Sequence, residues 1–153
     1  MRAVSEFINE MSDKSSLQTD GVSKVVEAGL LKILSEFMAS CDGIVGLMVS
    51  SADGMAWASK LKVGLDQHRF SAMSSALLAL SDNVVKECSS GKATNGKTKN
   101  VLIESDGGNV FVMHAGSNLL LTVFTDATTN LGLSLAHANK AAEEIVALDL
   151  AVP

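Results

Sequence analysis

The sequence predicts an α+β fold, an α/β sandwich in which one antiparallel sheet lies between layers of helices. Two Asp-Gly pairs, at residues 53–54 and 106–107, each separate runs of strand-forming residues, as in β-hairpins. Three further segments repeat apolar residues at intervals of three and four, which is typical of amphipathic helices. The last two strand-like runs are apolar at nearly every position, so helices should cover both faces of the sheet centre.

The first helix is expected from Val22 to about Ser40. Its apolar residues fall three and four positions apart: Val26, Leu30, Ile33, Leu34 and Phe37. Asp20 is a candidate N-cap. Residues 1–21 combine a short apolar pattern with a polar linker, so we expect an N-terminal extension or a short, frayed helix there.

A β-hairpin is expected next. Ile44 to Ser50 and Met55 to Ser59 are strand-like, and the Asp-Gly pair between them supplies the positive φ values that tight turns need. Trp57, in the second of these strands, is a candidate anchor for a partner or a residue packed beneath a helix. Packing is the favoured interpretation.

The middle helix is expected from Asp66 to about Cys88. One stripe of this helix is apolar and is expected to face the sheet: Phe70, Met73, Leu77, Leu80, Val84 and Cys88. The opposite side consists of small residues: Ala72, Ser75, Ala76 and Ala79. No charged residue occurs from Phe70 through Ser81, so the opposite side lacks the polar surface of an ordinary solvent-exposed helix. We therefore expect something to cover it.

Three consecutive strands and a last helix complete the expected order. The strand-like runs are residues 101–103, 110–113 and 119–124, which form a meander. The last helix has its apolar residues at helical spacing: Leu131, Leu135, Ala138, Ala142 and Ile145. The chain should therefore fold as helix, two strands, helix, three strands, helix.

Composition excludes several classes of function. The 153 residues, with a mass of 15.9 kDa, fit one domain. The net charge of -5 offers no positive field, so we expect no nucleic-acid binding. No apolar stretch approaches the roughly 20 residues of a bilayer span, no secretory signal is visible, and the two cysteines form no CxxC pair. A cytoplasmic protein without membrane insertion or a metal site is expected.

One motif points to nucleotide binding. Residues 91–98 match the phosphate-loop pattern GxxxxGK[ST], with Gly91, Gly96, Lys97 and Thr98 at the defining positions. Such a loop needs a strand before it and a helix after it, so that the helix N-terminus points at the phosphate. Here the expected order is reversed. A polar connection is favoured, and a nucleotide-binding enzyme that uses this segment is kept as an alternative.

Other catalytic patterns are missing from the sequence. The three histidines, His68, His114 and His137, lack the short spacing of metal ligands. No GxSxG, HExxH or paired-carboxylate arrangement occurs, so catalysis is disfavoured.

The order of elements and several motifs resemble the roadblock family, the dynein light-chain type of module that is also widespread in bacteria. The resemblance covers about residues 22–148. It rests on the small-residue helix around residues 71–80, the strand Val101 to Glu104, and the following motifs: Leu31, Leu34 and Phe37 before Asp42-Gly43-Ile44-Val45-Gly46-Leu47-Met48-Val49-Ser50, then Asp53-Gly54, and Asn130-Leu131-Gly132-Leu133. A roadblock-like domain over residues 22–150 is therefore expected.

This resemblance implies a five-stranded antiparallel sheet of profilin-like topology. The middle helix would cover one face and the two terminal helices the other. It also implies a homodimer in which the middle helices pack together and the third strands pair. The candidate interface residues are Ala72, Ser75, Ala76, Ala79, Val101 and Ile103.

The resemblance further implies a non-enzymatic adaptor that binds a Ras-like small GTPase, similar to the bacterial gliding-polarity regulators, with no cofactor of its own. Arg69 and Asp82 on the middle helix are candidate contacts for that partner, and Arg69 is the only arginine beyond Arg2. A second alternative is a structural dimer within a larger sensory or motility assembly.

Overall fold

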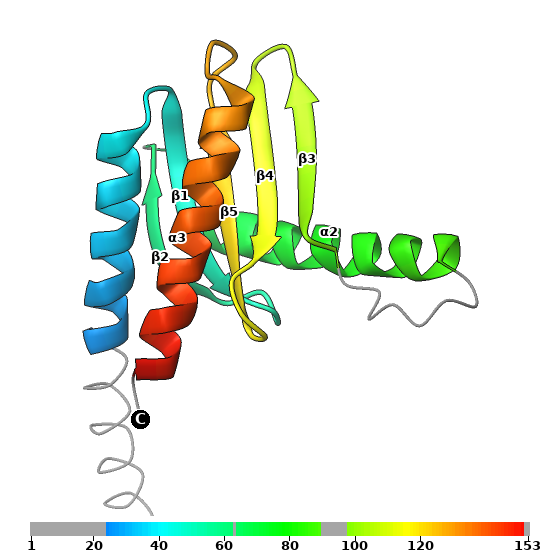
Figure 1. Ribbon diagram of the computed structural model, residues 1–153, viewed down its shortest axis with the longest axis horizontal. Coiled ribbons are helices and arrows are strands. Elements are labelled where there is room, and N and C mark those ends of the chain that lie inside the picture. Colours follow the sequence, from blue (N-terminus) through cyan, green and yellow to red (C-terminus); the bar gives the residue numbers. More distant parts are fainter. Residues whose placement is uncertain (1–23, 63, 90–97, 152–153) are drawn as a thin grey trace, which may run out of the picture.

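The computed structural model describes residues 24–62, 64–89 and 98–151 (Figure 1). The N-terminal helix is described over residues 24–40. It is followed by a hairpin of β1 (Ile44–Ser51) and β2 (Ala56–Leu61), and by α2 (Gln67–Cys88). A meander of three strands and the last helix follow: β3 (Asn100–Ser105), β4 (Gly108–His114), β5 (Leu119–Thr125) and α3 (Leu131–Ala151). The predicted order of elements is confirmed; the expectations for residues 1–21 and Asp20 lie outside the described residues.

All five strands form one antiparallel sheet in the order β2-β1-β5-β4-β3. The N-terminal helix and α3 cover one face of this sheet, and α2 crosses the other face (Figure 1). The central strands β4 and β5 are buried almost throughout, as their continuous apolar sequences predict. The second strand of the hairpin, β2, and the first strand of the meander, β3, lie at the two edges of the sheet.

The larger core lies between the sheet and the two terminal helices. The predicted apolar stripe of the first helix is buried there, with Leu30 and Leu34 almost inaccessible to solvent. The two helices also approach each other closely, because a Cβ built on Gly29 would lie 2.7 Å from a methyl carbon of Leu148. Glycine at this position therefore allows the close approach of the helices, which offsets its low helix propensity.

The face of α2 that packs on the sheet differs from the prediction. The buried residues are Ser71, Ser74 and Leu78, whereas Phe70 and Leu77 are only partly buried. The rest of the expected sheet-facing stripe is exposed: Met73, Leu80, Val84 and Cys88. Serine side chains are short enough to let the helix lie close to the sheet. Ser74 accepts a hydrogen bond from the hydroxyl of Thr122 in β5, and Ser71 donates to the carbonyl oxygen of His68 in its own helix. The large apolar side chains consequently point away from the sheet.

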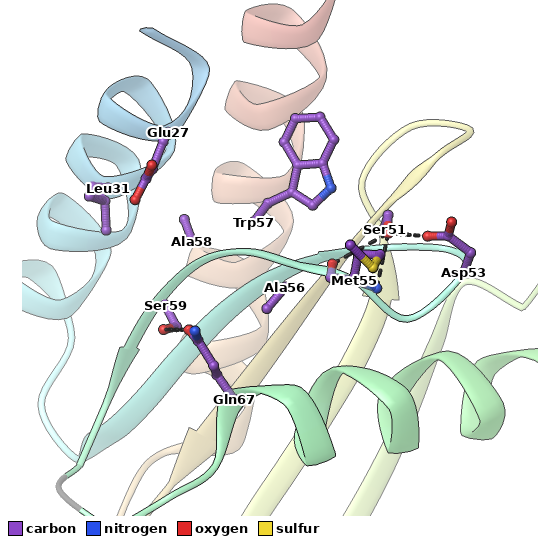
Figure 2. Close-up of a pocket in the computed structure, with 10 residues that line it drawn as sticks. All are labelled: Glu27, Leu31, Ser51, Asp53, Met55, Ala56, Trp57, Ala58, Ser59 and Gln67. Atoms are coloured by element: carbon purple, nitrogen blue, oxygen red, sulfur yellow. Dashed lines mark hydrogen bonds between the residues drawn. The ribbon is translucent and has the colours of Figure 1, made fainter. Parts of the chain in front are cut away.

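The prediction that Trp57 packs beneath a helix is also wrong, since 41% of the residue is exposed. The cause is a β-bulge. Val49 pairs with Ala58 and Ser50 pairs with Ala56, so Trp57 is an extra residue without a partner in β1. Figure 2 shows Trp57 on the same side of the sheet as Glu27 and Leu31 of the N-terminal helix.

Candidate interaction surface

The outward face of α2 is an apolar surface on this chain. Met73 is 56% exposed, Leu80 is 62% exposed and Val84 is 54% exposed. The exposed alanines 72, 76 and 79 lie between them and leave the backbone accessible to a second helix. We call the exposed apolar residues of this face the α2 outer face: Ala72, Met73, Ala76, Ala79, Leu80 and Val84. Exposed apolar surfaces of this kind mark interaction sites.

The α2 outer face continues toward the free edge of β3. Val101 is partly buried against Leu78, Val112 and Leu120, whereas Ile103 remains 42% exposed. Figure 1 shows the C-terminal turns of α2 extending past β3, beyond the edge of the sheet. The helix therefore lacks support from its own sheet over those turns. The free side of an edge strand and the unsupported turns of an apolar helix lie at the same edge of the molecule.

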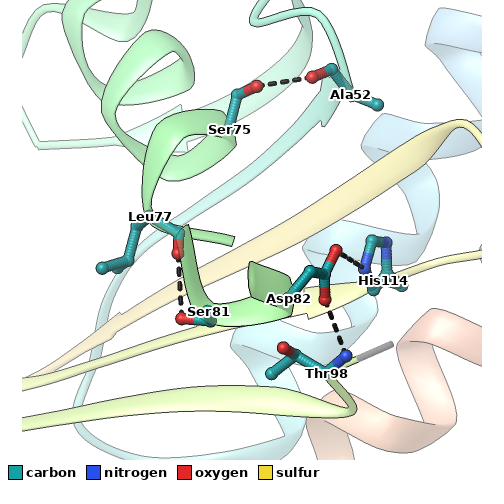
Figure 3. Close-up of polar contacts among 7 residues, drawn as sticks. All are labelled: Ala52, Ser75, Leu77, Ser81, Asp82, Thr98 and His114. Atoms are coloured by element: carbon teal, nitrogen blue, oxygen red, sulfur yellow. Dashed lines mark hydrogen bonds and ion pairs between the residues drawn. The ribbon is translucent and has the colours of Figure 1, made fainter. Parts of the chain in front are cut away.

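Ser75, one of the predicted interface residues, is half-buried and serves its own chain. Its hydroxyl donates a hydrogen bond to the carbonyl oxygen of Ala52 in the turn between β1 and β2 (Figure 3). The turn is thereby fixed to α2. Ser75 lies at the border of the α2 outer face.

Asp82 joins three segments of the chain (Figure 3). Its Oδ1 accepts a hydrogen bond from the backbone N–H of Thr98, with the two atoms 2.7 Å apart. Its Oδ2 lies 3.6 Å from Nε2 of His114 at the end of β4. Partial burial acts to raise the pKa of the Asp82 carboxyl, but the hydrogen bond from the backbone N–H of Thr98 and the proximity of His114 outweigh it, so the pKa is lowered. Asp82 therefore anchors the start of β3 to α2.

Arg69 lies exposed in the first turn of α2, where its backbone N–H donates to the N-cap carboxylate of Asp66 over 3.4 Å. Within the described residues its guanidinium forms no ion pair. The side chain is thus available at the surface. Arg69 and Asp82 are separated along α2 by more than three turns.

The phosphate-loop pattern falls largely on residues 90–97, outside the described residues. Its flanks are described. The α2 helix ends at Cys88 before the pattern, and the strand β3 begins at Asn100 after it. The segment is therefore not followed by the helix N-terminus that phosphate loops require, and the backbone N–H of Thr98 is already bonded to Asp82. In the described ranges no three His, Cys, Asp or Glu side chains gather so as to hold a metal ion.

Sequence analysis missed the apolar members of this surface, Met73, Leu80 and Val84, because it assigned them to the sheet. The uncharged run from Phe70 through Ser81 was the available signal, since it leaves no polar face for solvent whichever way the helix turns.

Among the helices in the described part of the chain, none has the length and apolar character needed to cross a membrane.

A family model and a sequence relative both match most of the chain. The model of the Roadblock/LC7 domain matches residues 30–125. An uncharacterized protein of Methanocaldococcus jannaschii is 34% identical over 107 residues, which cover 70% of this chain and 89% of that protein.

Several solved structures have a fold similar to that of this chain. The gliding protein MglB of Thermus thermophilus has a TM-score of 0.69 at 15% identity, covering 80% of this chain and 90% of that chain. Schizosaccharomyces pombe profilin is more distant, with a TM-score of 0.50 at 13% identity, covering 69% of this chain and 87% of that chain. The expected five-stranded sheet and its profilin-like topology are confirmed.

Proposed function

The chain belongs to the Roadblock/LC7 domain family, and on that premise we propose that it is a non-enzymatic homodimeric adaptor in the cytoplasm. Its partner is a Ras-like small GTPase whose nucleotide cycle or location it modulates. Residues 22–150 form the functional domain, and residues 1–21 form an extension to it.

The main observation in support of the dimer is the exposed apolar surface of α2. Exposing Met73, Leu80 and Val84 to water costs free energy that burial against a second copy recovers, at about 25 cal/mol per Å² of apolar surface. The intervening alanines let two α2 helices approach closely. Ala72, Ser75, Ala76 and Ala79 lie in or beside the contact between helices.

The edge strand β3 supports the same arrangement. Its outward backbone groups have no partner strand within the described residues, and an exposed edge invites pairing with another chain. Pairing of β3 with its copy, through Val101 and Ile103, would continue the sheet across the dimer. The second copy would also support the turns of α2 that extend past the sheet (Figure 1).

The GTPase partner follows from the role that the family resemblance implies. Arg69 is an exposed cation near the start of α2, whereas Asp82 is engaged with Thr98. Of the two candidate contact residues, Arg69 is therefore the one available to a partner.

Affinity capture with the purified chain tests this function. The chain is immobilised, the native lysate is supplemented with GDP or with a non-hydrolysable GTP analogue, and the retained GTPase is identified and then titrated in purified form. We expect one nucleotide state to bind more tightly. Arg69→Glu should weaken binding about tenfold, as loss of a charged contact does, while Lys140→Glu on exposed α3 makes the same charge change and should leave binding unchanged.

Two results contradict the proposal. If no GTPase is retained in either nucleotide state, the chain is not a GTPase adaptor, and a dimeric subunit of a larger sensory or motility assembly is favoured instead. If Arg69→Glu and Lys140→Glu bind equally well, the GTPase does not contact α2 at Arg69.

A further inference from the structure

A groove runs along the free edge of β2, at the opposite side of the sheet from β3 (Figure 2). Its volume is about 730 Å³. The strand itself forms the floor, Glu27 and Leu31 of the N-terminal helix line one wall, and Gln67 at the start of α2 lines the other. The groove therefore follows the backbone of an edge strand that is paired on one side only.

The backbone of β2 is available for pairing. As the last strand in the sheet order, it has no second neighbouring strand within the described residues. Its six residues, at about 3.3 Å per residue, span about 20 Å. An extended segment that adds to such an edge gains main-chain hydrogen bonds over its whole length, while side-chain pockets supply specificity.

Because of the bulge in β2, Trp57 offers an exposed aromatic surface that a side chain of the added segment can contact. Regular pairing would give Trp57 a partner in β1 and would place neighbouring residues alternately on the two faces of the sheet. The extra residue instead leaves Trp57 on the same side as Glu27, with 41% of its surface exposed beside Met55, which is 64% exposed. Bulges at sheet edges commonly redirect a side chain in this way.

The charges that line the groove favour a cationic ligand. Two carboxylates line the groove, those of Glu27 and Asp53, and no lysine or arginine does. Within the described residues neither carboxylate forms an ion pair. An indole face attracts a guanidinium or ammonium group, and nearby carboxylates pair with it. We propose that the β2 groove binds an extended segment of another protein and that an arginine or lysine of this segment lies over Trp57.

A foreign segment fits this groove better than a second copy of the chain does. If copies already pair through β3, a further pairing through β2 at the other edge would extend the sheet without end, since the two contacts would not close a symmetric assembly. This choice of occupant rests on the proposed dimer. A closed dimer leaves its two β2 edges free for other proteins.

Selected peptides test the groove directly. Random heptapeptides are displayed on phage and selected on the intact chain, and the selected sequences are synthesised for titration. Trp57 is the only tryptophan, so its fluorescence reports occupation of the groove without a label. We expect enrichment of one arginine or lysine among β-forming residues, a change in Trp57 emission on binding, and slower amide hydrogen exchange in β2.

Two altered peptides separate the backbone and side-chain contributions. Replacing the basic residue of the peptide by glutamine should weaken binding about tenfold, as expected for loss of an ion pair together with a cation–π contact. Methylation of alternate backbone nitrogens of the peptide keeps every side chain and removes hydrogen-bond donors, and it should abolish binding if the peptide pairs as a strand.

Matched variants of the protein, followed by calorimetry, locate the contact. Trp57→Ala and Glu27→Lys should each weaken binding about tenfold or more. Leu133→Ala and Glu143→Lys change exposed residues on α3 and should bind as the unchanged chain does. Peptides without a basic residue, equal binding by Trp57→Ala, or no selected peptide at all would each overturn the proposal.

The assembly state is measured in the same preparation. Species larger than a dimer that Trp57→Ala abolishes would show that a second copy occupies the groove, which contradicts a foreign segment. A monomeric chain that still binds the selected peptides through Trp57 would refute the dimer alone, because the groove lies at the other edge of the sheet.

Discussion

Thr122 in β5 donates a hydrogen bond from its hydroxyl to the hydroxyl oxygen of Ser74 in α2, with the two oxygens 3.0 Å apart. Both residues are buried, and they lie where α2 crosses the sheet. This pair lets Ser74, in the stripe of α2 that faces the sheet, be buried with its hydroxyl hydrogen-bonded. A buried hydroxyl is tolerated when it is hydrogen-bonded, so the apolar stripe of the helix is left on the outside.

Removing one member of this pair should destabilise the fold. Ser74→Ala leaves the buried hydroxyl of Thr122 without this partner, and we expect the free energy of unfolding to fall by about 1–3 kcal/mol. Adding Thr122→Val replaces the orphaned hydroxyl with a methyl group and should recover most of that loss. Urea unfolding of both single variants and the double variant measures the coupling; strictly additive losses would contradict it.

Gly108, at the start of β4, should not tolerate a side chain. Its φ is +144°, and a Cβ there would lie 2.2 Å from the carbonyl oxygen of Thr125. Gly108→Ala should therefore lower the free energy of unfolding by at least about 2 kcal/mol. The adjacent Gly107 has nothing within 4 Å of its Cβ position, so Gly107→Ala should remain within about 0.5 kcal/mol of the unchanged chain. Equal thermal midpoints for both variants would refute this account of the β3–β4 turn.

Asp82 should stabilise the fold only while it is ionised. Because its pKa is lower in the folded chain than the usual 3.8, its contribution is complete above the unfolded pKa and is lost as the pH falls through the folded value. Asp82→Asn removes this dependence. The urea midpoint of the variant should fall less than that of the unchanged chain between about pH 5 and about pH 2.

A control for the loss of one negative charge is Asp106→Asn, in the exposed turn between β3 and β4. This variant should follow the unchanged chain over the same pH range. If Asp82→Asn and Asp106→Asn have the same acid dependence, the contact between Asp82 and Thr98 contributes nothing to it.

The phosphate-loop pattern should not bind nucleotide. Because a strand and not a helix follows it, no helix N-terminus is available for a phosphate. Isothermal titration with ATP or GTP and magnesium should detect no binding at micromolar concentrations, for the unchanged chain and for Lys97→Ala alike. Micromolar binding that Lys97→Ala abolishes would favour the nucleotide-binding enzyme over the adaptor.

Much of the fold could be predicted from residue patterns. The Asp-Gly turns and the helical spacing of apolar residues specify local geometry, so the hairpin, the meander and the terminal helices were predicted correctly, and both terminal helices bury the apolar stripes that were expected to face inward. The middle helix was different. Its apolar stripe and its small-residue stripe both face outward, and the stripe of Ser71, Ser74 and Leu78 packs on the sheet. With no charge to mark the solvent side, periodicity alone does not say which stripe meets the sheet.

Two other features depend on contacts that local patterns do not encode. The bulge at Trp57 changes the phase of β2 by one residue, and regular alternation gives no warning of such a shift. The hydrogen bond between Asp82 and Thr98 joins residues 16 positions apart across the end of α2. Both were found only once the strands and helices had been placed in space.

The mass of the purified chain in solution tests the dimer most directly. Light scattering at physiological concentrations should give about 31.8 kDa, twice the 15.9 kDa of one chain. Ala76→Glu places like charges opposite each other between two α2 helices and should weaken association at least about a hundredfold, whereas Ala136→Glu on exposed α3 should remain dimeric. A mass of 15.9 kDa for the unchanged chain would contradict the dimer.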